Sequence, residues 1–416
     1  MSRSKKLEVR ENGEFMAHVD TTSGNAELTT REITLNMGPQ HPSTHGVMHL
    51  ILHLQGEKIV KAEPDIGYLH RGMEKIAENL LYGQFVPYTD RLDYLSSMTN
   101  NLGYVSAVEK LLDLEIPERG KYIRVIVSEL SRLSSHLLAV GAWGLDLGAI
   151  TMVLYAFRER EMIMDLFEML CGARLTYNYM KIGGVRGDLP PGFKEKCSEF
   201  IKIFPKRVDE YETLLTGNRV WLQRNKGIGV MSAKDATDLG LTGPSLRGSG
   251  VKWDIRKDNP YLVYDRFDFD VPVGTNGDCF DRYMCRVEEM RQAARIIAQA
   301  LQQIPEGPVN ANAPDIVAPP RQDVYNNMEA LIHHFKIISH GFKAPVGEVY
   351  SSIEAPKGEL GFYIKSDGTE KPFRVKIRAP SFVGLQSIDP MSRGAYFADV
   401  VSVISSLDPV FGEVDK

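Results

Sequence analysis

The chain has 416 residues, of which 43% are hydrophobic and 25% are charged, and its formal net charge is -5. A chain of this length can bury a large core and suggests two or three structural units. The acidic balance argues against a nucleic-acid binder, which usually carries an excess of basic residues. The four cysteines form no Cys-x-x-Cys pair, so the sequence predicts neither a zinc or iron–sulfur site nor a disulfide framework.

The first 63 residues divide into a polar segment and a strand-forming segment. Residues 1–30 carry no apolar signal core and predict a flexible arm. Between residues 31 and 63, the runs T-L-N-M-G and V-M-H-L-I-L-H-L-Q-G alternate or stay apolar, as strands do, and a turn is expected near Gly56. The segment 31–63 therefore predicts an N-terminal β region.

The stretch N-M-G-P-Q-H-P-S-T-H-G interrupts these strands. Two histidines four residues apart would share one face of a helix and could hold a metal, but Pro39 and Pro42 exclude a regular helix. We therefore expect a tight loop in which His41 or His45, or both, face a group outside the backbone. The alternative is that both rings only form hydrogen bonds with nearby carbonyl groups.

Residues 64–225 predict a central helical bundle, because long helical runs alternate with short breaks. One run, 137–157, is long and apolar enough to span a bilayer and has a single charge, Asp146. Its three glycines favour a wholly buried helix pair, broken near 144–148, over a membrane span. Asp146 must then be paired, because an isolated carboxylate in apolar surroundings is costly. A further helix is expected from 193 to about 215.

Residues 226–416 predict a mixed region of loops, helices and a β-meander. Between 227 and 277 the chain is rich in Gly, Pro and aromatic residues and predicts loops and short strands. The run D-R-Y-M-C-R-V-E-E-M-R-Q-A-A-R-I-I-A-Q-A-L predicts a long helix. The run G-E-V-Y-S-S-I-E-A-P-K-G-E-L-G-F-Y-I-K-S-D predicts strands, and a final helix follows. His333 and His334, in the helix-like run E-A-L-I-H-H-F-K, are expected to pack rather than to bind a metal.

The sequence lacks the usual catalytic signatures. It contains no Walker or dinucleotide glycine loop, no G-x-S-x-G elbow and no H-E-x-x-H pair. What remains are polar residues near or within apolar stretches, namely His45, Asp146 and the R-L-D-Y motif that contains Tyr94. By residue type alone, a tyrosine such as Tyr94 is most often in the core, and Arg71, in L-H-R-G, could equally be a surface residue. The residues taken singly leave the function open.

Several motifs taken together resemble one protein family. In chain order they are G-P-Q-H-P-S-T-H-G, G-Y-L-H-R-G-M-E-K, R-L-D-Y, G-L-T-G-P-S-L-R-G-S-G-V-K-W-D-I-R-K and R-A-P-S-F-V-G-L-Q. After about Thr30 the chain is similar to the 49-kDa subunit of respiratory complex I, the D subunit of bacterial NADH–quinone oxidoreductase. That family resembles the large subunit of nickel–iron hydrogenases. The resemblance implies an α+β fold like a hydrogenase large subunit, with a central helical bundle and β-containing parts at both ends.

The same resemblance shows where this chain differs from a hydrogenase. Hydrogenases hold their metals with an early R-x-C-x-x-C and a terminal D-P-C-x-x-C-x-x-H. Here the corresponding segments are R-L-D-Y-L-S at 91–96 and D-P-V-F-G-E-V-D-K at 408–416, so the spacing is retained while every thiolate is gone. A nickel–iron centre requires soft thiolate ligands. Hydrogenase activity is therefore excluded, and no metal is expected on this chain.

The resemblance implies that the histidine loop enters a quinone cavity, with His45 and Tyr94 beside the quinone headgroup and His41 on the same loop. Reduction of a quinone adds two electrons and two protons, so its oxygens need donors as charge develops on them. The tyrosine hydroxyl can serve one oxygen, and a histidine that titrates near neutrality can serve the other. Asp146 is expected to orient His45 and to favour its charged form. The implied substrate is ubiquinone or menaquinone.

Electrons are expected from an iron–sulfur cluster in a neighbouring B-type subunit, because this chain has too few well-placed cysteines. The resemblance places Arg71 and Arg91 near that cluster, where a positive charge raises its potential. Many members carry a nearby histidine in a pattern like G-A-R-x-H, at the position of Thr176. Threonine cannot be protonated in the relevant range. The resemblance therefore implies a cluster potential that is low and depends weakly on pH.

The further partners implied are a C-type subunit and membrane subunits of the H and A types. The chain itself would be peripheral, on the cytoplasmic side of the bacterial inner membrane. The implied function is that of the quinone-site subunit of a proton-translocating NADH:quinone oxidoreductase. Two alternatives stay open. One is a related ferredoxin- or formate-linked membrane complex, which the missing thiolates weaken. The other is an assembly scaffold, for which His45 and Tyr94 would be dispensable.

Overall fold

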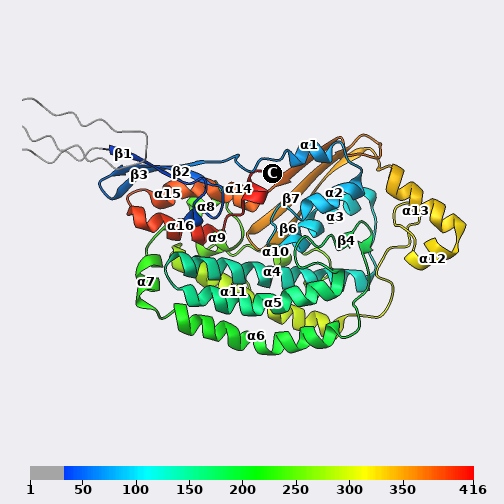
Figure 1. The fold of residues 1–416 in the computed structure, drawn as a ribbon, viewed down its shortest axis with the longest axis horizontal. Helices are drawn as coiled ribbons and strands as arrows, with labels where there is room; N and C mark the ends of the chain where they lie inside the picture. The colour runs from blue at the N-terminus through cyan, green and yellow to red at the C-terminus, as the bar shows by residue number, and fades with distance from the viewer. Residues whose placement is uncertain (1–31) are drawn as a thin grey trace, which may run out of the picture.

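The computed structural model describes residues 32–416, so the arm predicted for 1–30 lies outside the described residues. Long helices form one side of the molecule, and two three-stranded sheets with many of the short helices lie on the other (Figure 1). Both kinds of secondary structure are extensive in the described chain. The fold class is therefore α+β, as the sequence predicted.

The strands pair antiparallel with their neighbours. They are β1 (Glu32–Met37), β2 (His49–Gln55) and β3 (Lys58–Asp65) in the first sheet, β4 (Met180–Lys181) and β5 (Gly184–Val185) in a ribbon, and β6 (Gly347–Ala355), β7 (Gly358–Ser366) and β8 (Arg374–Arg378) in the last sheet. In β2, Leu50, Leu52 and Leu54 are buried, because alternate side chains of a strand share a face. The strands predicted near the N-terminus and the predicted β-meander are both confirmed.

Long helices form the bundle. They are α4 (Glu118–Asp146), α5 (Ile150–Cys171), α6 (Phe193–Leu215) and α11 (Cys279–Gln303). A further long helix, α3 (Ser97–Leu112), packs mainly on β6 and β7 of the last sheet. The helix α4 packs against both α5 and α11, and α6 packs on the same two helices. Because α11 comes from beyond residue 225, the bundle joins segments that are far apart in the sequence. The helix expected from 193 to about 215 is confirmed by α6.

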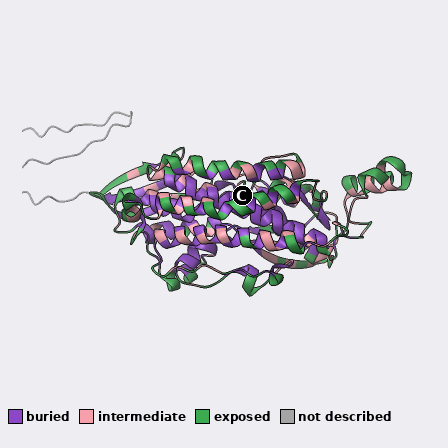
Figure 2. Cartoon of the chain, turned by 90° about the horizontal axis from the view of Figure 1, so that it is seen from below, coloured by how far each residue is buried: buried purple, intermediate pink, exposed green. Residues whose placement is uncertain are grey.

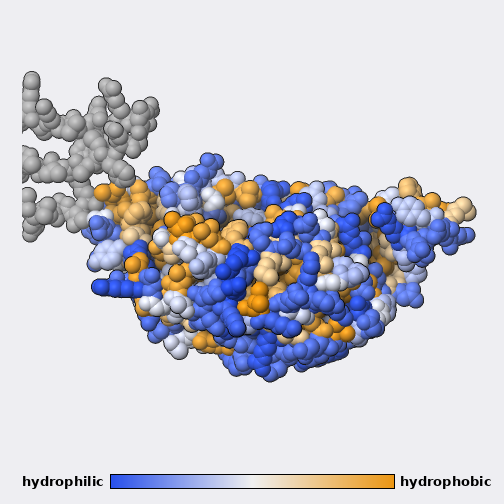
Figure 3. All heavy atoms as spheres, turned by 60° about the horizontal axis from the view of Figure 1, so that its bottom comes forward, coloured by the Kyte–Doolittle hydropathy of each residue, from blue (hydrophilic) through white to orange (hydrophobic). Residues whose placement is uncertain are grey.

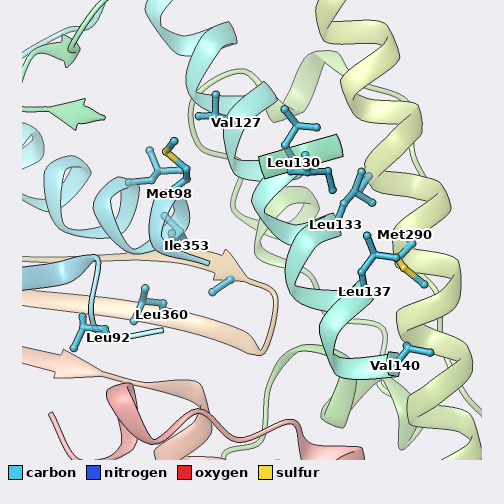
Figure 4. Packing of buried hydrophobic residues seen from close by; sticks show 14 of the residues in the cluster. Leu92, Met98, Val127, Leu130, Leu133, Leu137, Val140, Met290, Ile353 and Leu360 are labelled. Carbon is cyan, nitrogen blue, oxygen red and sulfur yellow. The ribbon is translucent and has the colours of Figure 1, made fainter. Parts of the chain in front are cut away.

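The hydrophobic core surrounds α4 (Figure 4). Its residues Leu130, Leu133, Leu137 and Val140 are fully buried, and Met290 of α11 lies beside them. Apolar side chains at spacings of three and four residues share one face of a helix, so α4 presents a continuous stripe to its neighbours. Buried residues are concentrated in this bundle (Figure 2). The position of α4, whose last residue is Asp146, is thereby fixed.

The apolar run 137–157 forms the end of α4 and the start of α5. Between the two helices the chain turns through Gly148, which has a φ of 89°. The predicted helix pair is confirmed, but the expectation that it is wholly buried is wrong for α5. Ile150 and Leu154 are exposed, because no other described segment covers this face. Within residues 32–416, no helix is long and apolar enough to cross a membrane.

Short helices and turns occupy much of the remaining chain. They are α1 (Met73–Ala77), α2 (Tyr82–Thr89), α7 (Arg219–Asn225), α8 (Ala233–Asp238), α9 (Gly243–Gly248), α10 (Ile255–Asp258), α12 (Arg321–Asn326), α13 (Met328–His340), α14 (Pro380–Gly384), α15 (Ile388–Ser392), α16 (Val400–Leu407), α17 (Phe411–Val414), η1 (Pro42–Thr44), η2 (Tyr264–Arg266), η3 (Leu385–Ser387) and η4 (Phe397–Asp399). The final helix predicted from the sequence corresponds to α16.

The prediction of short strands between 227 and 277 is wrong, because the structure has short helices there. Local capping explains the difference. The side chain of Ser232 accepts a hydrogen bond from the backbone of Asp235 at the start of α8, and that of Asp254 accepts one from the backbone of Arg256 at the start of α10. Such caps satisfy the free backbone donors of a helix start. They favour helical turns even where the side chains alternate as in a strand.

A buried ionic network joins these short helices to the bundle. Arg247 of α9 contacts Glu289 of α11 at 2.6 Å and Glu354 of β6 at 2.8 Å. Arg256 of α10 contacts Glu129 of α4 at 3.2 Å. Burial alone would raise the pKa of Glu289, but Arg247 and a neighbouring histidine hold it well below its usual range. Each of these carboxylates meets a guanidinium group, which offsets part of the cost of burying its charge.

The helices α12 and α13 form an arm that projects from one end of the molecule (Figures 1 and 2). Neither helix contains a buried residue, and Met328, Leu331 and Phe335 are exposed. Hydrophobic side chains are visible on this arm (Figure 3). His333 and His334, which were expected to pack rather than to bind a metal, are half-buried on this predicted helix. No described segment covers the apolar side of α13.

Close packing of α4 and α5 predicts the effect of a substitution at Gly144. A Cβ atom there would lie 2.9 Å from the Cβ of Met152, so Gly144→Val overpacks the interface. We expect the free energy of unfolding, measured by urea denaturation of the purified protein, to fall by about 1–3 kcal/mol. The control is Gly83→Ala in α2, where the added methyl group meets nothing within 4 Å. Equal stability of the two variants would contradict the packing.

Candidate functional site

The histidine loop is a tight turn between β1 and β2. It contains the short turn η1, and an isolated bridge joins His41 to Gly46. The Nδ1 atom of His41 accepts a hydrogen bond from the backbone of Ser43 at 3.2 Å. One ring nitrogen of His41 is thus used to cap its own loop. The predicted loop is confirmed. The two histidines differ in role, because only His41 uses a ring nitrogen to accept a hydrogen bond from the backbone of the loop.

His45 faces the end of α4. Its Nε2 atom lies 3.2 Å from an Oδ atom of Asp146 and 3.2 Å from the hydroxyl of Ser405 in α16. The same hydroxyl lies 2.8 Å from Asp146. The side chains of His45 and Asp146 are each only 11% exposed. Three segments far apart in sequence therefore meet in one polar group, and Asp146 has the partner that its apolar surroundings require.

His45 has a φ of 53°, in the left-handed region that few residues other than glycine adopt. The neighbouring Gly38 is also constrained, because a Cβ atom there would lie 2.1 Å from the carbonyl oxygen of Met48. The backbone of this loop is therefore held in an uncommon shape by close contacts. Such strain persists only where the surrounding structure enforces it, as at binding and catalytic sites.

Tyr94 lies between α2 and α3 and is 37% exposed. It packs on α17, since a Cβ atom at Gly412 would lie 3.2 Å from its ring. The histidine loop approaches the same short helix, where a Cβ atom at Gly46 would lie 3.9 Å from the ring of Phe411. Burial and the charge of Asp93 raise the pKa of Tyr94, so its hydroxyl stays protonated and can donate a hydrogen bond. The loop and Tyr94 thus flank one helix.

The segments 91–96 and 408–416 meet beneath Tyr94. Lys357, from the turn between β6 and β7, lies 3.3 Å from Asp93 and 3.0 Å from Asp408. Its side chain is 1% exposed, and its ammonium group also donates to the hydroxyl of Ser135 at 2.6 Å. Burial opposes the charge of Lys357, but Asp408 and Asp93 together raise its pKa above the ordinary value. The space between the two segments therefore contains an ammonium group.

The C-terminal segment also binds the motif G-Y-L-H-R-G. The carboxylate of Asp415 accepts hydrogen bonds from the backbone of Gly67 at 2.9 Å and of Leu69 at 2.8 Å. Arg71 donates to the carbonyl oxygens of Arg91 at 2.9 Å and of Gly412 at 2.6 Å. Arg71 is therefore partly buried at the site, whereas its residue type alone left a surface position open. Its contact brings the two predicted arginines together.

Thr176 lies in a loop that is tied to the same region. The backbone of Asn178 donates to both carboxylate oxygens of Asp90, at 3.1 and 3.3 Å, and Asp90 directly precedes Arg91. Burial raises the pKa of Asp90 to about 6. Thr176 has a φ of 56° and its hydroxyl bonds the adjacent carbonyl of Leu175. The residues Arg71, Arg91 and Thr176 therefore belong to linked segments.

Two hollows lie elsewhere. One of about 1600 Å³ lies between the α12–α13 arm and the body, and one of about 490 Å³ lies beside the C-terminus. Neither is lined by His45, Tyr94 or Asp146. We locate the candidate site by the convergence of polar side chains at α17, because reactivity depends on the groups present and not on volume. Within residues 32–416, no group of three or more His, Cys, Asp or Glu side chains is arranged to hold a metal ion.

Two residues of this region, Ser405 and Lys357, were not identified by the sequence analysis. The run V-V-S-V-I-S-S-L contains three serines in an otherwise apolar helix, which is the signal that could have pointed to Ser405. Lys357 gave no such signal. Ala355 pairs with Gly358, so Pro356 and Lys357 form a two-residue hairpin turn, and a lysine at such a turn is usually exposed.

Comparisons with known proteins agree with the resemblance seen in the motifs. The family described as respiratory-chain NADH dehydrogenase, 49 Kd subunit, matches residues 146–416. The D subunit of the NADH-quinone oxidoreductase of Geotalea uraniireducens is 58% identical over 388 residues, which cover 93% of this chain and 100% of that protein. The corresponding protein of Rhizobium meliloti, the second of its D subunits, is 57% identical over 390 residues, covering 94% and 96%. The chain therefore belongs to the family of the 49-kDa subunit of the respiratory-chain NADH dehydrogenase.

Proposed function

We propose that this chain forms the quinone site of a proton-translocating NADH:quinone oxidoreductase. The observation that supports this most directly is that His45, which contacts Asp146, and Tyr94 both belong to segments that pack on α17. Two different proton donors thereby lie near one short helix. A substrate that must receive a proton at each of two oxygens suits such a pair.

The proposed chemistry divides the two protons of quinone reduction between two side chains. The hydroxyl of Tyr94 donates to one quinone oxygen, because its raised pKa keeps it protonated until charge develops on the substrate. The imidazole of His45 donates to the other oxygen. Asp146 holds the ring in place through the contact with its Nε2 atom. Ser405 fixes the carboxylate of Asp146 in turn.

The electrons would come from an iron–sulfur cluster in a B-type partner subunit. The linked segments that carry Arg71, Arg91 and Thr176 form the face proposed for this partner. Arg91 is exposed and Arg71 is partly exposed, so both can act on a group outside the chain. Their positive charge would stabilise the reduced cluster and raise its potential. A C-type subunit is a further proposed neighbour.

The start of α5 supports a neighbour of apolar character beside the quinone site. Ile150 and Leu154 are exposed, and they lie four and eight residues after Asp146 in the chain. Exposed apolar faces of this kind mark surfaces that another protein covers. We assign this face to a membrane subunit of the H type or A type. The chain would then be peripheral, on the cytoplasmic side of the bacterial inner membrane.

Replacement of Tyr94 tests the proposed donor. In Tyr94→Phe, loss of a charge-assisted hydrogen bond worth about 1.5–3 kcal/mol should reduce the rate of quinone reduction roughly ten- to a hundredfold. Assembly and cluster content of the purified complex should not change. The matched control is Tyr155→Phe in α5, which has the same exposed fraction, 37%. Unchanged turnover of Tyr94→Phe with short-chain and native quinones would favour the scaffold alternative.

Replacement of Asp146 tests the histidine pair. In Asp146→Asn the imidazole of His45 loses the carboxylate that holds its Nε2 atom at 3.2 Å. The rate of quinone reduction should therefore fall, because the ring is less firmly oriented toward the substrate. Steady-state quinone reduction by the purified complex measures this change, and Asp113→Asn, an exposed carboxylate at the end of α3, is the control. An unchanged rate would argue against the pair.

Thr176 predicts how the cluster potential depends on pH. Because threonine binds no proton, redox titration of the neighbouring cluster between about pH 6 and 8 should give a weak dependence. Thr176→His should introduce a dependence, since an imidazole can bind a proton when the cluster is reduced. Thr176→Asn is the control, because asparagine tolerates the left-handed backbone but does not titrate. A slope near one proton per electron in the native complex would refute this assignment.

A further inference from the structure

The ion pairs of Lys357 leave one nearby carboxyl group of the described chain without an ion pair of its own. Lys357 contacts both Asp93 and Asp408, and all three side chains are almost completely buried. Glu413 of α17 is 1% exposed and lies close enough to Asp93 for their charges to interact. Within the described chain its carboxylate makes no ion pair and accepts a hydrogen bond from the backbone of Ser381 at 3.0 Å. Glu413 is therefore the unbalanced member of the group.

The surroundings of Glu413 contain few cations able to neutralise it. The charged groups that act on it or on its neighbours are Asp93, Lys357, Asp408, Arg286 and Lys416. Arg286, on α11, acts on Asp408. The ammonium group of Lys416 donates to the carbonyl oxygen of Ile377 at 2.7 Å. A buried carboxyl group without an adjacent cation is neutralised by keeping its proton.

The position of Glu413 connects it to Tyr94. Gly412, the residue before it, packs on the ring of Tyr94, and Asp93 directly precedes Tyr94 in the chain. Two separate links, one through α17 and one through the 91–96 segment, thus join the carboxyl group to the tyrosine. Asp93 and Lys357 also act electrostatically on Tyr94 itself. Asp93 and Lys357 therefore act on both Glu413 and Tyr94.

We propose that Glu413 is a proton-holding group that restores the hydroxyl of Tyr94 after each reduction of quinone. This inference rests on the proposed function. When the partner's iron–sulfur cluster has supplied the electrons and Tyr94 has given its proton to the quinone, the O–H bond of Glu413 breaks and the O–H bond of Tyr94 forms again. Solvent then reprotonates Glu413. The step moves one proton and requires no further oxidant or reductant.

The pH range of this step follows from the environment of the carboxyl group. Burial and the negative charge of Asp93 raise the pKa of Glu413 to about 7. A carboxyl group with a raised pKa is protonated below that value and loses the proton as the pH rises through it. The supply of protons to Tyr94 should therefore be full near pH 6 and should fall by about tenfold by pH 8.

Glu413→Gln in the assembled complex tests the proposal. The infrared carbonyl band of a protonated carboxylic acid should disappear from the native complex between pH 6 and 8, and the variant should lack that component. Quinone reduction by the variant should be slower at pH 6, and the ratio of its rates at pH 6 and pH 8 should be about tenfold smaller than the native ratio. His45 is present in both complexes, so comparing the two ratios isolates the contribution of Glu413.

Matched variants separate this role from a structural one. Glu195→Gln, at an exposed position of α6, should match the native profile. Glu413→Asp keeps a carboxyl group and should keep the pH dependence. If Glu413→Gln fails to assemble, Lys357→Met provides the test, because loss of the ammonium group should move the infrared transition to a higher pH.

Two results would overturn the proposal. They are a uniform loss of rate in Glu413→Gln with the native pH profile, and an infrared spectrum that does not change with pH in both the native and the Lys357→Met complexes. Either result, combined with a slow Tyr94→Phe, would remove the role of Glu413 and leave the proposed function intact. Full activity of Tyr94→Phe would instead remove the proposed function itself.

Discussion

Charged groups enclosed among α4, α9, α10, α11 and β6 are almost completely buried, and many of them meet a counter-charge at hydrogen-bond distance. Arg247 and Arg256 provide most of these contacts, to Glu289, Glu354 and Glu129. Breaking one such pair leaves an uncompensated buried charge, which costs about 3–5 kcal/mol. The positions of the bundle and of the last sheet are thereby linked. The hairpin turn that carries Lys357 reaches the site because β6 is held in place by Glu354.

The fold was predicted best where hydrophobic periodicity and local stop signals agree. The helix α6 follows L-P-P-G and carries a regular apolar stripe, so its bounds could be read from the sequence. The region 227–277 was misread because its short helices depend on single caps such as Ser232, whereas its aromatic residues alternate as in a strand. The exposed apolar faces of α5 and α13 were misread for another reason. Periodicity shows that a face is apolar, but not which molecule covers it.

The candidate site was only partly accessible from the sequence. Asp146 was identified because a lone carboxylate in an apolar run requires a partner, and the resemblance indicated His45. Lys357 could not be found in this way, because its partners Asp93 and Asp408 are far from it in the chain. At the positions where the related hydrogenases carry thiolates, this chain has Asp93 and Glu413 among others. The ammonium group of Lys357 provides a fixed positive charge between the same segments.

The exposed apolar side chains of the projecting arm affect how the subunit behaves before it joins its partners. Exposed apolar side chains on α13 give a newly made subunit the same surface that chaperones and proteases recognise on a misfolded protein. A chain made in excess of its neighbours is therefore open to aggregation or degradation even when its bundle is fully folded. Cellular quality control can in this way use one short helix to distinguish orphan copies from assembled ones.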